Sequence, residues 1–172
     1  MVSGSSGFEL SGSGVLAAGA GQEFSARYTG STKMAGVKRG QLSVGLVSKG
    51  RAGSGLADVS LAPVTVNVSA TVYRPAVGVL GASTVDLGSV REGESFARKA
   101  LSVRNGAIAD AYSEKLNVRL GEVSGAVEKG SGEVSLLGAG ATDATGLTVG
   151  LSGNGTAGLK GGTVRVDYET DG

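Results

Sequence analysis

Apolar and polar residues alternate along most of this chain, and the alternation is most regular between residues 64 and 73. One side of that segment carries small apolar side chains, those of Val64, Val66, Val68, Ala70 and Val72. The residues between them are Thr, Asn, Ser or Tyr. Because successive side chains of a strand point to opposite faces, this pattern predicts one half-buried β-strand.

Shorter segments of the same kind recur along the rest of the chain. They span residues 23–28, 41–48, 84–88, 96–104, 115–120, 133–137, 145–151 and 163–169. Clusters of Gly, Ser, Asn and Asp separate them, and these residues tolerate the dihedral angles of turns. A short helical turn is expected only within residues 104–116. The pattern therefore predicts an all-β fold, in the form of an antiparallel sandwich.

Composition adds that the cores of this fold are thin. Glycine accounts for 32 of the 172 residues, roughly a fifth, against the usual ~7 %. There is no Gly-X-Y period and there are two prolines, which excludes collagen. The apolar residues are mainly Val, Leu and Ala, and no run approaches the ~18 apolar residues of a transmembrane helix. We therefore expect many tight turns and no membrane-spanning segment.

A long internal repeat organises the chain. The closing segment TAGLKGGTVRVDYETDG, residues 156–172, has a second copy in MAGVKRGQLSVGLVSKG, residues 34–50. At a shift of 122 positions the identical residues are Ala35 and Ala157, Gly36 and Gly158, Lys38 and Lys160, Gly40 and Gly162, Val44 and Val166, and Gly50 and Gly172. Upstream, VLAAGA at 15–20 matches LLGAGA at 136–141. A period near 122 is the size of one immunoglobulin-like domain.

The stretch STVDLGSVREGESFARKALSVRNGA, residues 83–107, resembles bacterial choice-of-anchor D domains and the related abnormal-spindle and hydin-type immunoglobulin-like domains. The matching positions are Leu87-Gly88, Val90, Gly93, Ser95 and Asn105, with Leu87 where the family usually has Phe. Residues 136–172 resemble the second half of that family, and residues 64–75 resemble its closing strand. In the first copy, SKGRAG stands where the second copy has TDG.

This resemblance implies an out-of-phase repeat with incomplete domains. Residues 1–75 would be the later strands of one immunoglobulin-like domain, and residues 76–172 the earlier strands of the next without its final strand. The segment Val64–Tyr73 would be the counterpart of that final strand. Proteins of this family are generally structural or adhesive and lie outside the bacterial cell or on its surface, so the resemblance implies the same location here. The first ten residues carry no secretory signal pattern.

No catalytic motif accompanies this architecture. The chain has no His and no Cys, so a Ser-His-Asp or Cys-His triad cannot form within it. Neither G-x-S-x-G nor the phosphate-binding G-x-x-x-x-G-K-[ST] occurs. We therefore expect a protein that is not an enzyme and uses no cofactor, since enzymatic activity would require an Asp/Glu pair in a groove that the sequence does not visibly build.

Three acids near the end of the chain are the sole metal candidates. Asp167, Glu169 and Asp171 alternate and precede Gly172, which resembles the first half of a calcium loop. The first copy of the repeat, GLVSKG at residues 45–50, has none of these acids. The alternative interpretation, a solvated strand edge, is the expected one.

Charge divides unevenly between the two halves. Residues 1–75 hold 7 Lys/Arg and 3 Asp/Glu, a net +4, whereas residues 76–172 hold 9 and 12, a net −3. The expected interpretation is a solvated surface, and the alternative is that the oppositely charged halves attract each other in successive copies of the protein. The basic residues are scattered and aromatics are few, so we expect no nucleic-acid binding. Lys38-Arg39 is expected at a hairpin tip.

These observations predict a non-enzymatic structural protein that self-associates. An incomplete sandwich leaves an unpaired strand edge, which another strand can complete. The donor would be Val64–Tyr73 or the whole amino-terminal half, from within the chain or from a neighbour. Donation between neighbours would give a head-to-tail filament. The alternative is an adhesin, or a carbohydrate- or partner-binding module from a longer repeat array.

Overall fold

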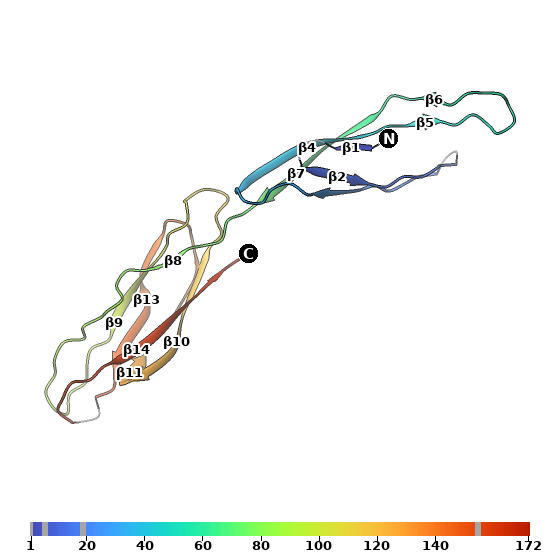
Figure 1. Cartoon of the computed structure of the whole chain (residues 1–172). Helices are drawn as coiled ribbons and strands as arrows, with labels where there is room; N and C mark the ends of the chain where they lie inside the picture. Colours follow the sequence, from blue (N-terminus) through green and yellow to red (C-terminus); the bar gives the residue numbers. More distant parts are fainter. Residues whose placement is uncertain (1, 5–6, 18–19, 154–155) are drawn as a thin grey trace. The chain divides into compact units, whose positions relative to one another are not determined.

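A computed structural model describes residues 2–4, 7–17, 20–153 and 156–172 (Figure 1). The fold is all-β, every ladder between named strands is antiparallel, and no helix occurs in the part of the chain described. The chain divides into two compact units, Met1–Val72 and Tyr73–Gly172. We call them the first and second units and describe each by itself.

The first unit contains one three-stranded sheet and two strand pairs. The sheet has the order β1 (Val2–Gly4), β4 (Gly36–Val44) and β7 (Val64–Val72). The pairs are β2 (Phe8–Ser11) with β3 (Ser25–Tyr28), and β5 (Val47–Ser48) with β6 (Val59–Ser60). Phe8 and Leu42 are its buried apolar side chains among the described residues, and the Phe8 ring meets Tyr28 edge-on at 4.9 Å.

Strands β4 and β7 form the longest ladder of this unit. Nine residue pairs run without a register shift from Gly36 opposite Val72 to Val44 opposite Val64. The alternation predicted for β7 is present toward its end, where Val68 and Val72 are half-buried between exposed neighbours. The prediction of a hairpin tip at Lys38-Arg39 is wrong, because both residues lie inside β4. The chain reverses earlier, in bends between Gly30 and Met34.

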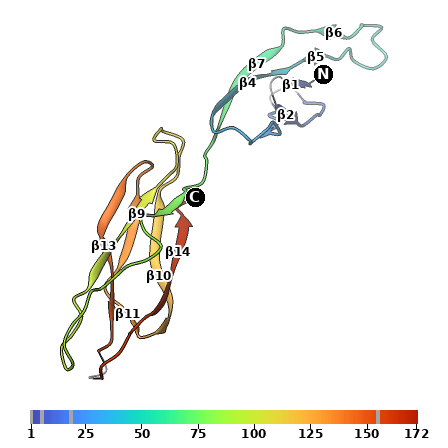
Figure 2. The same ribbon diagram turned by 60° about the vertical axis from the view of Figure 1, so that its left-hand side comes forward.

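The second unit is a pair of antiparallel sheets with a shared core (Figure 2). One sheet has the order β12 (Glu133–Leu137), β10 (Leu116–Gly125) and β14 (Gly162–Thr170). The other has the order β11 (Val127–Lys129), β13 (Thr142–Leu151), β9 (Lys99–Asn105) and β8 (Gly78–Leu80). Both sheets contribute to one cluster of buried side chains, Leu101, Val103, Leu116, Val118, Val134, Leu147 and Val149. This arrangement is sandwich-like.

Asn105 is the buried polar residue at one end of this core, with no exposed surface. Its side-chain oxygen accepts hydrogen bonds from the N–H groups of Val77 and Ala107, at 3.2 and 3.1 Å. Its amide nitrogen donates to the carbonyls of Glu114 and Leu137, both at 3.1 Å. Asn105 therefore ties β9 to three other segments and satisfies backbone groups that would otherwise be buried without partners.

Most predicted strands are present in the structure, but two local predictions are wrong. Residues 84–88 form no strand, because neither side of that segment pairs with another strand. Residues 106–115 form turns and bends instead of a helical turn. There the carboxylate of Asp110 accepts the N–H of Tyr112 at 2.8 Å, a local bond that competes with helix formation. The upstream part of the repeat at residues 15–20 lies partly outside the described residues.

Candidate functional site

Strand β14 has a free edge in the second unit. It is the last strand of its sheet, and β10 is its partner among the described strands. At its two ends, Asp171 N–H donates to the carbonyl of Lys115, and the carbonyl of Gly161 accepts from Ala126 N–H. Backbone groups alternate sides along a strand, so odd-numbered residues of β14 face β10. The free edge therefore presents the N–H and C=O groups of Gly162, Val164, Val166, Tyr168 and Thr170.

A groove of about 800 Å³ lies beside β14 in the second unit. One wall is β14 with the residues that precede it, and the other is the segment 82–90. The groove reaches the buried side chains of Leu101 and Val149. Its other apolar lining residues are Leu80, Val85, Leu87, Val90, Phe96, Val127, Leu151, Leu159, Val164 and Val166. The groove thus runs from the surface to the edge of the core along one side of β14.

The two segments that flank the groove form no strand. Residues 84–88, which have the alternating pattern of a strand, run along one wall. Residues 158–161 form part of the other wall, and the Leu159 side chain is completely exposed. An unpaired strand-like segment on each side of an apolar groove is what a two-sheet fold exposes where one strand position is unfilled.

The first unit contains the same local sequence with a neighbouring strand in place. Strand β4 carries the first copy of the repeat, so Gly36–Arg39 corresponds to residues 158–161. Gly36–Arg39 is strand, and it pairs with Ser69–Val72 of β7. Gly36–Arg39 thus has a neighbouring strand, β7, whereas residues 158–161, which share Gly and Lys with it at two of the four positions, have none among the described strands.

The predicted assembly residues lie together on one side of β7. Val64 and Val66 are 52 % and 48 % exposed, whereas Val68, Ala70 and Val72 are half-buried. Strand β7 is the last strand of its sheet, with β4 on one edge and no second partner among the described strands. Exposed apolar side chains continue from it into the β5–β6 hairpin, at Leu46, Val47, Leu56, Val59 and Leu61.

Two of the three candidate calcium ligands, Asp167 and Asp171, interact with other groups of the protein. Asp167 pairs with Arg165 at 2.8 Å and lies 3.9 Å from Arg119. Asp171 accepts the Lys115 N–H at 2.6 Å. Within the described residues, no three Asp, Glu, His or Cys side chains gather in an arrangement that could hold a metal ion. The structure thus does not bring Asp167, Glu169 and Asp171 together.

Two carboxyl groups of the second unit, those of Asp110 and Asp143, have a lowered pKa because of the hydrogen bonds that they accept. The Arg74 guanidinium donates to Asp110 at 2.5 Å and lowers the pKa of that carboxyl, with the Tyr112 N–H adding to the effect. Asp143 accepts the N–H groups of Gly146 and Thr145, at 2.7 and 3.0 Å, which lowers its pKa. Asp110 stabilises a loop and Asp143 stabilises an irregularity within β13, and neither lines the groove beside β14.

A second, shallower groove of about 620 Å³ lies over β10, β12 and β14. Polar side chains line it, among them Asn117, Arg119, Glu133 and Asp167. Asn117 is used by the fold, because its side-chain oxygen accepts the N–H of Leu136 at 2.8 Å. Leu136 has a positive φ of 54°, at the point where the β10–β12 register shifts.

The residues that sequence reasoning missed are those of the acceptor side. Leu159, Val164 and Val166 line the groove, as does the segment 82–90, and none of them was identified from the sequence as part of a binding surface. The repeat held a signal for them, since residues 158–166 align with β4, the partner of β7.

Comparison with protein-family models, with curated proteins and with solved structures found no match. In the part of the chain described, no helix is long and apolar enough to cross a membrane.

Proposed function

We propose that this chain is a non-enzymatic structural protein of a bacterial surface or extracellular matrix, which self-associates by strand complementation between half-domains. The observation that carries the proposal is the free edge of β14 beside an apolar groove that reaches the core. Strand addition at such an edge supplies main-chain hydrogen bonds for affinity and pockets for alternate side chains. The product is a head-to-tail chain of subunits, because a contact between two different surfaces stays open unless its rotation closes.

Two further features support self-association over capture of an unrelated protein. The chain carries its own strand with suitable alternation, β7, and the repeat relates the partner of β7 to β14. The halves also have opposite net charge, +4 for residues 1–75 and −3 for residues 76–172. Attraction between halves of opposite sign favours contact between the first half of one copy and the second half of another.

A proline on the free edge tests the acceptor side. Val164→Pro removes one N–H that faces away from β10, whereas Val164→Ala removes the same side chain and keeps the N–H. We expect wild type and Val164→Ala to sediment as polymers at micromolar concentration and to form fibres on electron micrographs. Val164→Pro should stay monomeric with an unchanged far-ultraviolet circular dichroism spectrum. Equal assembly of the proline and alanine variants would overturn the proposal.

Deletion of residues 59–75 gives a second test that leaves β14 intact. The shortened chain should remain soluble and fail to polymerise, and unchanged fibres would rule out donation by this segment. This variant also keeps the proposal testable if Val164→Pro fails to fold.

The alternative is an adhesin or partner-binding module, and the polar groove over β10, β12 and β14 is where such a module would bind a ligand. Size measurement at micromolar concentration separates the two functions, because a binding module stays monomeric whereas a fibre subunit does not. A monomeric wild type would favour the module.

A further inference from the structure

We infer that the groove beside β14 takes β7 of a second copy of this chain, by exchange, in a defined antiparallel register. Val64 of the donor lies opposite Val166, Val66 opposite Val164, and Val68 opposite Gly162. This inference rests on the proposed function and adds to it the identity of the donor strand, its register and the step that releases it.

The register is taken from the first unit, where β7 pairs with β4, the strand that the repeat aligns with β14. Val44 lies opposite Val64 in the β4–β7 ladder, and Gly40 lies opposite Val68. The repeat shift of 122 places Val44 on Val166 and Gly40 on Gly162. The same donor strand on the copied acceptor sequence therefore pairs Val64 with Val166.

Side-chain direction decides which edge of β7 meets β14. Val164 and Val166 face the groove, and residues directly opposite in an antiparallel pair share a face. The valines of β7 enter the groove if β7 presents to β14 the edge that it presents to β4. Use of its other edge would turn the strand over and point Thr65 and Asn67 into the groove. An apolar groove favours the valine face, so β7 must leave β4 first.

The flanks of the groove fit a strand in this position. Donor residues Ser69–Val72 would lie beside residues 158–161, as they lie beside Gly36–Arg39 in the first unit. The segment 84–88 on the opposite wall, which pairs with no described strand, would gain a neighbouring strand. Insertion would therefore provide a neighbouring strand for two segments that form no strand in the free chain. Residues 84–88 have the alternating pattern of a strand, and residues 158–161 correspond to part of β4 in the repeat.

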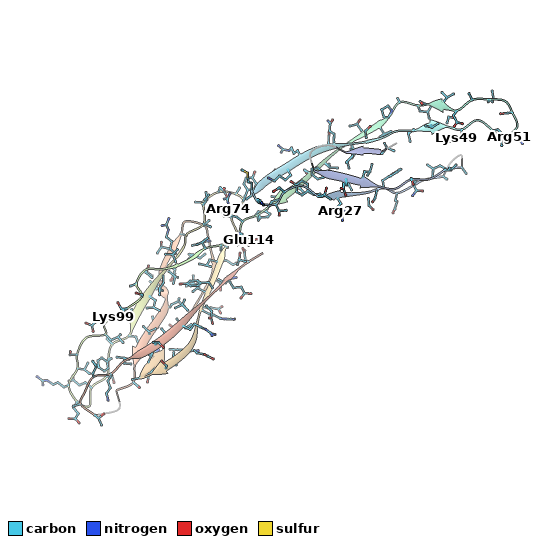
Figure 3. The ribbon with its side chains drawn as sticks, viewed as in Figure 1. Arg27, Lys49, Arg51, Arg74, Lys99 and Glu114 are labelled. Atoms are coloured by element: carbon cyan, nitrogen blue, oxygen red, sulfur yellow. The ribbon has the colours of Figure 1, made fainter. Side chains whose placement is uncertain are left out.

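The covalent connection excludes donation within one chain in this register. Val72 would lie opposite Gly158, before the start of β14. Arg74 is held near the other end of β14: its carbonyl accepts the Glu114 N–H at 3.0 Å, while the neighbouring Lys115 carbonyl accepts the N–H of Asp171 at 3.1 Å (Figure 3). The nine residues of β14 span ~30 Å at ~3.3 Å per residue. Two residues reach at most ~7 Å, so the donor must be a second copy.

A cysteine pair captures this contact in a chain that contains no cysteine of its own. Thr65 and Arg165 would lie directly opposite on the solvent face, in a pair whose backbone groups face away from each other. Such pairs have Cα atoms ~4.5 Å apart, within reach of a disulfide. Mixed chains carrying Thr65→Cys or Arg165→Cys should give a disulfide-linked heterodimer on oxidation. Thr71→Cys, six residues along and ~20 Å away in this register, is the matched control.

A second pair tests the exchange step. Ser43 lies opposite Thr65 in the β4–β7 ladder, so Ser43→Cys with Thr65→Cys in one chain locks β7 onto β4 when oxidised. We expect the sedimentable fraction to fall at least tenfold on oxidation and to recover on reduction. The control is Glu9→Cys with Arg27→Cys, which locks β2 onto β3 and should leave assembly unchanged.

The outcomes separate this inference from the proposed function. Assembly by the oxidised Ser43–Thr65 lock would overturn strand exchange, and stronger capture by Thr71→Cys would overturn the register. Closure of a Thr65–Arg165 disulfide within isolated monomers would overturn donation by a second copy. In each of these cases the proposed function stands if Val164→Pro still blocks assembly. Capture of the Thr65–Arg165 pair without any effect of Val164→Pro would instead count against the acceptor edge itself.

Discussion

The two units of this chain share a repeat and differ in how much core they bury. Among the described residues, the first unit buries two apolar side chains, Phe8 and Leu42, whereas the second buries eight. The shared part of the repeat supplies β4 to one unit and β14 to the other. The second unit also contains β8, β9 and β10. Strands β8 and β9 belong to the four-stranded sheet, and β10 is the central strand of the three-stranded sheet that contains β14.

This difference shows that the repeated strands do not make a core by themselves. A sheet buries its apolar face when a second layer covers it. In the second unit β9 and β13 supply that layer, and their Leu101, Val103, Leu147 and Val149 meet Leu116 and Val118 of β10. In the first unit Val64, Val66 and the apolar side chains of the β5–β6 hairpin stay exposed. We therefore expect the second unit to account for most of the cooperative stability of the chain.

The largest expected effect comes from Asn105, which has no counterpart in the first unit. Asn105→Ala would leave two N–H groups and two carbonyls without their partner at a fully buried position. Unsatisfied buried groups cost ~1–3 kcal/mol each, so we expect a loss of about 4 kcal/mol from the second unit. Urea titration followed by hydrogen exchange and mass spectrometry would measure the free energy of unfolding of each unit separately. Equal loss of protection in both units would contradict the comparison.

A matched pair of leucines compares the two cores directly. Leu147→Ala should cost the second unit about 3 kcal/mol, because its neighbours are close-packed and cannot collapse into the cavity. Leu42→Ala removes the same atoms from a side chain that is equally buried, 1 % exposed against 0 % for Leu147. We expect less than half the effect there, since a thin layer can close over the gap. Similar losses in the same titration would show that the first unit has a rigid core of its own.

Sequence reasoning identified the strands whose pairing is local and failed where pairing depends on distant segments. The alternation in β7 was sufficient to predict that strand, because β4 ends 20 residues before β7 begins and pairs with it along its whole length. Residues 84–88 have a strand pattern but no neighbour to bond, so pattern alone predicted a strand that does not form. The hairpin tip predicted at Lys38-Arg39 does not form, because the β4–β7 ladder continues through both residues.

For the same reason, the donor strand of the candidate site could be predicted from the sequence and the groove could not. The donor face of β7 follows from period-two alternation, which is a property of one segment. The groove is formed by 82–90, β13 and β14, which lie far apart along the chain, so it needed the structure. The repeat could have indicated Val166, because it aligns with Val44, but it gives no sign that Leu159 is exposed.

A smaller effect is expected where Tyr168 of β14 packs over Gly78 of β8. A Cβ at position 78 would overlap the Tyr168 ring, so Gly78→Ala should displace that ring and cost about 2 kcal/mol. Burial raises the pKa of Tyr168 above its ordinary value of 10.0, and exposure should bring it back. Ultraviolet titration of the phenol would measure this, with Tyr168→Phe to assign the signal. An unchanged Tyr168 pKa would show that the ring does not depend on β8.

The smallest expected effect contrasts Asp143 of the second unit with Asp58 of the first. The N–H groups of Gly146 and Thr145 lower the pKa of Asp143 below its ordinary 3.8. The pKa of Asp58 is lowered by Lys49 and by the Gly50 N–H. A lowered pKa means that the folded state binds its proton less readily than the unfolded chain. The stabilisation is therefore complete above pH 3.8 and declines as the pH falls toward the folded-state pKa.

The two acids should differ in salt dependence. Asp143 bonds to fixed backbone groups, so Asp143→Ala should cost the second unit about 1 kcal/mol at pH 7 in low or high salt. The Lys49–Asp58 pair is exposed, so the effect of Asp58→Ala should be smaller and should fade in 1 M NaCl. Urea titrations of both variants at pH 7 and at pH 3, with and without salt, would measure the four differences. If the effect of Asp143→Ala depended on salt, charged side chains and not these N–H groups would stabilise Asp143, and this irregularity of β13 would be no better fixed than the Lys49–Asp58 pair of the first unit.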